Sequence, residues 1–298
     1  MKNFKSKACM LGFVLAFIVV AATAAVDPPL TFTFKAFDVP GATATNSGGI
    51  NNAGVIVGQY TDSALVNHGF ILNGKKLTKL DDPKGTAGTT GASNLALNGP
   101  IAVVGTYTSA KTGGSVGFLY KGGKFTDVPG PKGSLASTAN AINDHGNITG
   151  AYVDSAGTQH AYVLVGTKYT TIDPPGSTTP SGNGINNSGN VVIVGGSNPA
   201  FTAYLYTAKT KKFKTINVPK ESGSFVTDIN TEGDVTYQAI DSAGNSHGAL
   251  FHQGKYYVYN YKNSALTYAG AVNDHSTIVG GYATTSSGSI HGLLATYK

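Results

Sequence analysis

The sequence predicts an all-β protein, a six-bladed β-propeller of four-stranded antiparallel blades whose ring is closed by the N-terminal strand completing the last blade. Three observations predict this fold. A repeat of about 45 residues runs through the chain, a period typical of solenoids and propellers. Each copy holds four segments of strand length, and the copy cut short at the C-terminus is completed by a segment near the N-terminus.

Four sub-motifs recur in fixed order along the chain. The first is Gly-Ile-Asn-Asn around Asn51, and its leading asparagine returns at spacings of 47, 45, 43, 44 and 43 residues: Asn98, Asn143, Asn186, Asn230 and Asn273. The second is a β-branched run ending in glycine and often tyrosine, as in VIVGQY and AVVGTY. The third begins with His-Gly or His-Ala, and the fourth follows a Gly-Lys or Lys-Lys turn and ends near proline, as in KFTDVPG. Their β-branched and aromatic content favours strands and leaves no amphipathic helix of useful length.

The connections between the sub-motifs have the composition of tight turns. Asn51 and Gly54 occupy the first and fourth positions of a type I turn, and the same pair recurs in the third, fourth and fifth copies. Asp154 to Gly157 and Asp241 to Gly244 are typical of hairpin turns. Each copy is therefore expected to form a four-stranded meander.

The two ends of the chain predict how the ring closes. The chain stops at HGLLATYK, which is a third strand, so the sixth copy lacks its fourth. Residues 31–40, TFTFKAFDVP, match the fourth sub-motif and precede the first Gly-Ile-Asn. An open solenoid does not require its first strand to complete its last repeat, whereas a ring is closed when the N-terminal strand pairs with the last repeat.

The repeats resemble the bacterial "probable extracellular repeat, HAF family", which is named for a His-Ala-Phe triplet beside Gly-Ile-Asn-Asn turns and Asp-x-Pro-Gly segments. The resemblance spans nearly the whole chain after the signal segment. The nearest copy of the triplet is His160-Ala161-Tyr162, and two copies lack the histidine. The resemblance implies an extracellular location and a repeat architecture, and it implies no catalytic residues.

The N-terminal segment predicts export. Residues 1–25 place three lysines before an apolar run from Met10 to Val20, which is followed by Ala22-Thr23-Ala24, and this is the pattern of a removed signal peptide. Residues 26–298 are then a single propeller domain, secreted or periplasmic, without a membrane span and expected to be a monomer. Cys9 would leave with the signal, so disulfides are not expected.

Charge argues against one class of partner. Loss of the three signal lysines would lower the formal charge from +6 to +3, and the chain contains no arginine. Arginine supplies the planar fork used for bidentate contacts to phosphate and guanine. Nucleic acid is therefore not an expected partner.

The recurring polar residues favour structural interpretations. Third strands of different blades lie too far apart for their histidines to share one metal ion, so we expect each histidine to tie its blade to a neighbour or a loop, and no metal or cofactor is predicted. An asparagine that opens a type I turn bonds its own backbone, which explains the asparagine ring without a ligand.

Asp144 and Asp274 are expected to face solvent on separate blades. The tyrosines of the KYYVYNYK segment either cover a blade or stack on a partner. No catalytic motif is recognised, so the catalytic residues are unknown.

The channel mouth is the predicted ligand site. Polar residues and two aromatics precede the Ile-Asn positions on the side of the ring that carries the longest loops, and no lysine or arginine is among them. Asn46, Asn140, Asn183 and Tyr268 are the expected ligand-binding residues, with Ser93, Thr138, Ser181 and Phe225 on the same rim. This composition suits a neutral glycan, and an extracellular protein surface is the other expected partner.

The predicted function is a binding or scaffold module. The alternative is an extracellular propeller lyase or hydrolase with its active site at this mouth.

Overall fold

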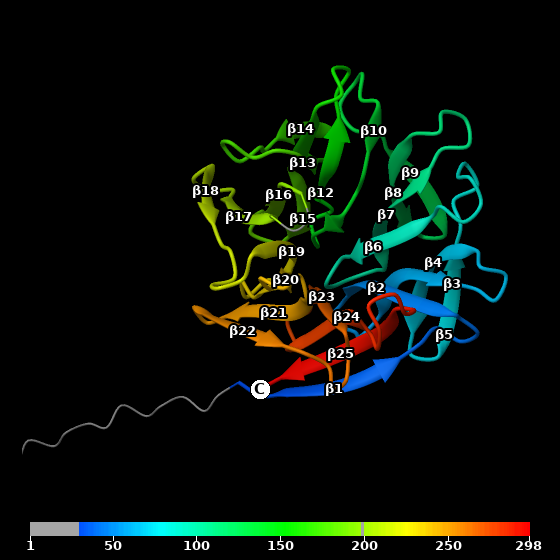
Figure 1. Ribbon diagram of the computed structural model, residues 1–298. Helices are drawn as coiled ribbons and strands as arrows, with labels where there is room; N and C mark the ends of the chain where they lie inside the picture. The colour runs from blue at the N-terminus through cyan, green and yellow to red at the C-terminus, as the bar shows by residue number, and fades with distance from the viewer. Residues whose placement is uncertain (1–29, 198–199) are drawn as a thin grey trace, which may run out of the picture.

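The computed structural model describes residues 30–197 and 200–298. Within these ranges the regular secondary structure consists of β-strands, without helices. The predicted signal peptide, residues 1–25, lies outside the described residues. Figure 1 shows the strands grouped into sheets around a common centre, which is a β-propeller arrangement. The predicted all-β class is therefore confirmed. Within the described ranges, no helix has the length and apolar character needed to cross a membrane.

The strands follow the order of the sequence repeats. The first repeat contains β2 (Ala44–Ile50), β3 (Ile56–Thr61), β4 (Asn67–Asn73) and β5 (Lys76–Leu80). The second contains β6 (Gly91–Leu95), β7 (Ala102–Thr108), β8 (Ser115–Lys121) and β9 (Lys124–Val128). The third contains β10 (Ala136–Ser137), β11 (Ala141–Ile142), β12 (Ile148–Val153), β13 (Gln159–Val165) and β14 (Lys168–Thr171).

The second half of the chain continues the same order. The fourth repeat contains β15 (Ser181–Ile185), β16 (Val191–Gly195), β17 (Thr202–Thr207) and β18 (Lys212–Thr215). The fifth contains β19 (Gly223–Ile229), β20 (Val235–Ile240), β21 (Ser246–His252) and β22 (Lys255–Tyr259). The sixth contains β23 (Leu266–Val272), β24 (Thr277–Ala283) and β25 (His291–Tyr297), and β1 (Phe32–Phe37) lies beside β25.

The hydrogen-bonded sheets differ from the expected six separate four-stranded sheets. Three sheets have four strands, one has five and one has eight. The eight-stranded sheet joins the fifth and sixth repeats through a single parallel pair, Ser246 with Leu266. The five-stranded sheet arises because β10 and β11 pair separately with β12, on either side of residues 138–140. Backbone hydrogen bonds between strands therefore do not form one continuous sheet around the centre, and the described strands fall into five separate sheets.

The predicted pairing of the chain ends is confirmed. β1 lies antiparallel to β25, and the register runs from Phe32 opposite Tyr297 to Phe37 opposite Gly292. Phe32–Phe37 thus supply the fourth strand that the sixth repeat lacks, and the two strands run side by side in Figure 1.

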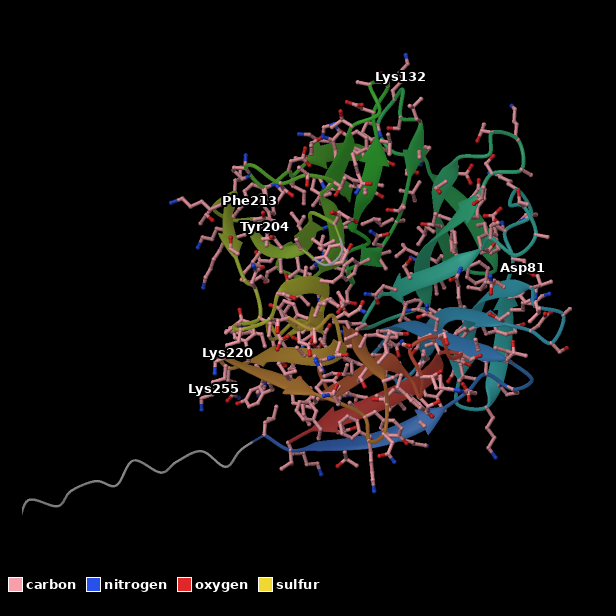
Figure 2. All side chains as sticks on the ribbon, viewed as in Figure 1. Asp81, Lys132, Tyr204, Phe213, Lys220 and Lys255 are labelled. Atoms are coloured by element: carbon pink, nitrogen blue, oxygen red, sulfur yellow. The ribbon has the colours of Figure 1, made fainter. Side chains whose placement is uncertain are left out.

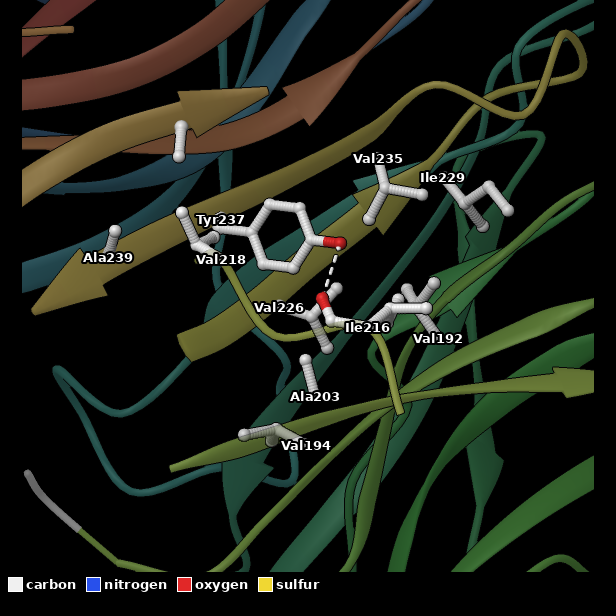
Figure 3. Packing of buried hydrophobic residues seen from close by; sticks show 11 residues of the cluster. Val192, Val194, Ala203, Ile216, Val218, Val226, Ile229, Val235, Tyr237 and Ala239 are labelled. Carbon is white, nitrogen blue, oxygen red and sulfur yellow. Dashed lines mark hydrogen bonds between the residues drawn. The ribbon is translucent and has the colours of Figure 1, made fainter. Parts of the chain in front are cut away.

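Apolar side chains pack between consecutive repeats. Six buried clusters separate the repeats, one for each neighbouring pair, and the cluster between the last and first repeats includes Ala271 and Val279 with Ile50 and Phe70. Figure 3 shows the cluster between the fourth and fifth repeats, where the Tyr237 hydroxyl donates a hydrogen bond of 3.0 Å to the Ile216 carbonyl. The second strand of each repeat is buried on both faces, as in β16, which explains its continuous β-branched sequence.

Candidate functional site

A cavity of about 700 Å³ opens at the centre of the ring of repeats. Its wall is built mainly from the innermost strand of each repeat and from residues 138–140 between β10 and β11. All eight residues of the predicted rim line this one cavity: Asn46, Ser93, Thr138, Asn140, Ser181, Asn183, Phe225 and Tyr268. Sequence reasoning therefore located residues that the fold brings together, although their binding of a ligand stays a prediction.

A β-bulge interrupts five of the six innermost strands at the same place. A bulge adds one unpaired residue, bends the strand and redirects a side chain, and bulges are common beside functional sites. In every case the extra residue lines the cavity: Gly48, Ser93, Asn183, Thr227 and Gly270. In the third repeat, the strand is split into β10 and β11 instead. The irregular backbone is thus concentrated at the cavity wall.

The two predicted amides Asn140 and Asn183 are held by the neighbouring repeat. Asn140 Nδ2 donates to Ser181 Oγ at 2.9 Å and to the Gly182 carbonyl at 3.0 Å. Asn183 Nδ2 donates to the Val226 carbonyl at 2.9 Å. These hydrogen bonds fix the orientation of both side chains, so their amides are preorganised and part of their donor capacity is used within the protein.

Tyr268 and Asn46 meet across the boundary between the last and first repeats. The Tyr268 hydroxyl donates a 2.5 Å hydrogen bond to Asn46 Oδ1. The tyrosine ring lies against Gly281, where an added Cβ would come within 2.6 Å of the ring and the hydroxyl. Burial raises the pKa of Tyr268, so its hydroxyl remains a neutral donor. An aromatic face with a fixed hydroxyl is thereby placed on the cavity wall.

The cavity lining carries no Lys, Asp, Glu or His side chain from residues 30–197 and 200–298. It consists of Asn, Gln, Ser, Thr and Tyr together with small and apolar residues. In Figure 2 the labelled lysines Lys132, Lys220 and Lys255 lie at the periphery of the ring of repeats, away from its centre. Such a wall offers many neutral hydrogen-bonding groups without a counter-charge for an ion.

Two buried polar residues near the cavity were missed by the sequence analysis. Asn94 lines the cavity, and Asp228 lies within hydrogen-bonding contact of its side chain. The equivalent inner-strand positions in the other repeats are Gly49, Ala141, Gly184 and Ala271. Burial raises the pKa of Asp228 to about 7, although hydrogen bonds from Ile229, Val272 and Asn94 act in the opposite direction. The sequence carried one signal for these two residues: Asn94 and Asp228 replace the glycine or alanine that the other repeats have at this position.

The asparagine ring is largely structural, as predicted, but it has five members. Asn143, Asn186, Asn230 and Asn273 are buried, as is Asn51, and each accepts a hydrogen bond at Oδ1 from the backbone four residues on. Asn98 is exposed instead, because the second repeat has two additional residues in this turn and Ala96 takes the equivalent place.

The aspartates of these turns do not face solvent on separate blades, which corrects that expectation. Asp144 accepts from Asn98 Nδ2 at 2.9 Å and from Asn187 Nδ2 at 2.7 Å. Asp274 accepts from Asn52 Nδ2 at 2.9 Å. Burial opposes ionisation of Asp144, but the amide donors prevail and lower its pKa. Both carboxylates therefore bridge neighbouring repeats at the end of the ring opposite the cavity opening.

The recurring histidines tie parts of a single repeat together. His68 Nδ1 contacts Asp81 at the end of the fourth strand, at 2.9 Å, and its Nε2 contacts Asp62 in the preceding turn, at 3.2 Å. His160 makes the same pair of contacts with Asp173 and Asp154. The predicted tie to a loop is correct, whereas the histidines do not reach the next repeat through these contacts. Across the described ranges, no group of three or more His, Cys, Asp or Glu side chains could hold a metal ion.

A further polar cluster lies between the fifth repeat and the C-terminal strand. Asp234 accepts from the Tyr297 hydroxyl at 2.6 Å and contacts His252 Nδ1 at 2.7 Å. Asn230 Nδ2 lies 3.3 Å from the same carboxylate. Three side chains thus contact the Asp234 carboxylate, and through Tyr297 they connect the fifth repeat to the C-terminal strand.

Comparison with known proteins supports the fold. No family model matches the chain, and no curated protein matches it. Among solved structures, TolB from Acinetobacter baumannii shares 12% identity at a TM-score of 0.54, covering 81% of this chain and 65% of TolB. This chain therefore corresponds to about two thirds of the TolB length.

Two further solved structures match over most of both chains. A putative gluconolactonase shares 10% identity over 90% of this chain and 92% of its own, at a TM-score of 0.52. The SapL1 lectin, in complex with α-methyl fucoside, shares 11% identity over 86% and 94%, also at a TM-score of 0.52. At such identities these likenesses concern the fold alone, which in this chain is the β-propeller arrangement of Figure 1.

Proposed function

We propose that the protein is an exported binding module that holds a neutral, hydroxyl-rich ligand, a glycan, in the central cavity. The observation that carries this proposal is an uncharged cavity of about 700 Å³ whose amides and hydroxyls are fixed by contacts between repeats. A saccharide presents hydroxyl groups and an apolar ring face, which suit these groups and the Tyr268 ring. No Asp, Glu or His among residues 30–197 and 200–298 lines the cavity, which favours a binding role over the acid and base chemistry of a hydrolase or lyase.

The architecture of the binding module is part of the proposal. We infer that each of the six repeats is one blade and that the eight-stranded sheet is two blades touching at one residue pair. Six apolar clusters between six repeats support this count. We further propose that the chain belongs to the extracellular HAF-type repeat family, supported by its Gly-Ile-Asn and His-Ala motifs, and that it acts as a monomer after export.

A glycan array of neutral oligosaccharides tests the function. We expect binding by the wild type and at least a tenfold loss in Ser93→Tyr, because the larger side chain would extend from the half-buried Ser93 position on the cavity wall into the space of the ligand. Ser188→Tyr is the matched control, since Ser188 is exposed in the Asn186 turn at the opposite end of the inner strand. Absence of binding to any neutral glycan, or equal binding by Ser93→Tyr, would contradict the proposal.

A further inference from the structure

We propose that Asn94 and Asp228 form a proton-linked recognition element beside the central cavity, with Asn94 donating to an oxygen of the ligand and Asp228 holding Asn94 in place. This inference rests on the proposed function, because it concerns a ligand in the same cavity. Ligand binding would then be strongest when Asp228 is ionised and would weaken as the pH falls.

The positions of the two residues single them out among the repeats. They stand where the other repeats carry glycine or alanine, and both are buried, with Asn94 7% and Asp228 5% exposed. An added Cβ on Gly49 would lie 2.8 Å from Asn94 Oδ1, and one on Gly184 would lie 2.8 Å from Asp228 Oδ1. The glycines of adjacent repeats therefore leave the space that these two side chains fill.

The hydrogen bonds of Asn94 define its orientation. Its Oδ1 accepts from the Leu95 backbone N–H at 2.7 Å, so its amide nitrogen is the group that donates to Asp228. An amide nitrogen carries two hydrogens, and the carboxylate takes one of them. Since Asn94 lines the cavity, the second hydrogen is the donor available to a ligand oxygen.

The surroundings of Asp228 decide when the carboxyl ionises. Asn94 from β6, Gly184 from β15 and the Val272 backbone from β23 face it, and none of these groups carries a charge. The charged group whose field reaches Asp228 is Asp274, which also raises its pKa. No cationic side chain from the described part of the chain pairs with Asp228, so the buried carboxyl changes its charge near neutral pH. A modest interaction with a ligand can therefore shift its protonation equilibrium.

The linkage has a definite sign. The ionised carboxylate only accepts hydrogen bonds, so it fixes the Asn94 amide with its second N–H free. The protonated carboxyl carries a donor of its own and holds the amide more weakly. A ligand that uses the oriented amide therefore favours ionisation, releases a proton on binding and lowers the pKa of Asp228. A pKa lowered by one unit corresponds to affinity up to about tenfold weaker at low pH.

Two measurements on the full-length mature protein test this. The first needs no ligand: a ¹³C NMR titration of the Asp228 carboxyl, assigned by its loss in Asp228→Asn. We expect a midpoint near pH 7 in the wild type and a higher midpoint in Asn94→Ala, because the ionised form loses a donor. A midpoint near the ordinary value of 3.8, or one unmoved by Asn94→Ala, would overturn the proposal.

The second measurement is the neutral glycan array read at pH 6 and pH 8. We expect wild-type signals that correspond to affinities about threefold to tenfold weaker at pH 6 and a flat pH response in Asp228→Asn. Asp81→Asn, which removes an exposed carboxylate just after β5, is the control and should keep the wild-type response. Binding that is equal at both pH values, or equally pH-dependent in Asp228→Asn, overturns the proton linkage alone. An array without signal at either pH contradicts the glycan proposal and the linkage together.

Discussion

The buried turn asparagines act twice, within a repeat and between repeats. Asn273 Oδ1 accepts from the backbone of its own turn at 3.0 Å, while its Nδ2 donates to the Asn51 carbonyl of the first repeat, also at 3.0 Å. Asn143 and Asn230 make the same donation to the repeat that follows each of them. A residue selected for a local turn thereby also stabilises the contact between neighbouring repeats.

Replacing Asn186 by alanine should destabilise the protein by about 1 to 2 kcal/mol, because its Oδ1 accepts two backbone hydrogen bonds at 3.1 Å in a buried place. Asn73→Ala is the matched control and should change stability by about 0.5 kcal/mol or less, since Asn73 is exposed at the end of β4. Urea denaturation gives both values. If Asn186→Ala were as stable as the wild type but lost glycan binding, the structural interpretation of this residue would be wrong.

The stability of the protein should depend on Asp228 in a pH-dependent way. Its folded pKa of about 7 exceeds its ordinary value of 3.8, so between these values the folded chain binds more protons than the unfolded chain. Stability from this group is therefore present below pH 4 and declines as the pH rises to 7, by at most about 4 kcal/mol. Asp228→Asn removes this decline.

Thermal unfolding of Asp228→Asn and the wild type from pH 4 to pH 8 checks this expectation. The melting temperature of the variant should rise relative to the wild type as the pH increases through this window. A constant difference between the two proteins would show that Asp228 ionises alike in the folded and unfolded chains.

At the scale of elements, β1 connects the two ends of the chain. It pairs with β25 along its whole length, and Phe32 and Phe34 pack on Tyr259 of the fifth repeat, with ring centroids 4.6 and 5.7 Å apart. His291 also contacts Asp38 just after β1, at 3.0 Å, which reproduces the histidine tie of the other repeats. One strand therefore completes the sixth repeat and covers the fifth. The tyrosines of the KYYVYNYK segment are partly accounted for by this packing.

Deleting residues 26–40 should markedly lower the melting temperature, because it exposes the edge of β25 and the apolar surface beneath Phe32 and Phe34. A chain beginning at residue 26 is the control. Circular dichroism melts of both proteins measure the difference, and a truncated protein that kept the control's melting temperature would show that β1 is dispensable.

At the scale of the whole molecule, several features could be predicted because they follow from the repeat period of the sequence. These are the repeats themselves, the pairing of the N-terminal strand with the last repeat, and the polar rim of the cavity. The merged sheets could not be predicted, since one bridge between Ser246 and Leu266 depends on how closely two repeats approach. The displacement of Asn98 required knowledge of a two-residue insertion that pairing alone reveals. Asn94 and Asp228 lie on opposite halves of the chain, and no local pattern indicates their contact.

The most direct test of the central claim, that the cavity within the ring of repeats is the binding site, is a ¹H–¹⁵N NMR titration with the neutral glycan of strongest array signal. The side-chain amides of Asn46, Asn94, Asn140 and Asn183 should report binding, because all four line the cavity. We predict saturable shifts of these four resonances with little change in the exposed Asn73 at the end of β4. Shifts confined to outer strands and turns, with the four cavity amides unmoved, would contradict the account.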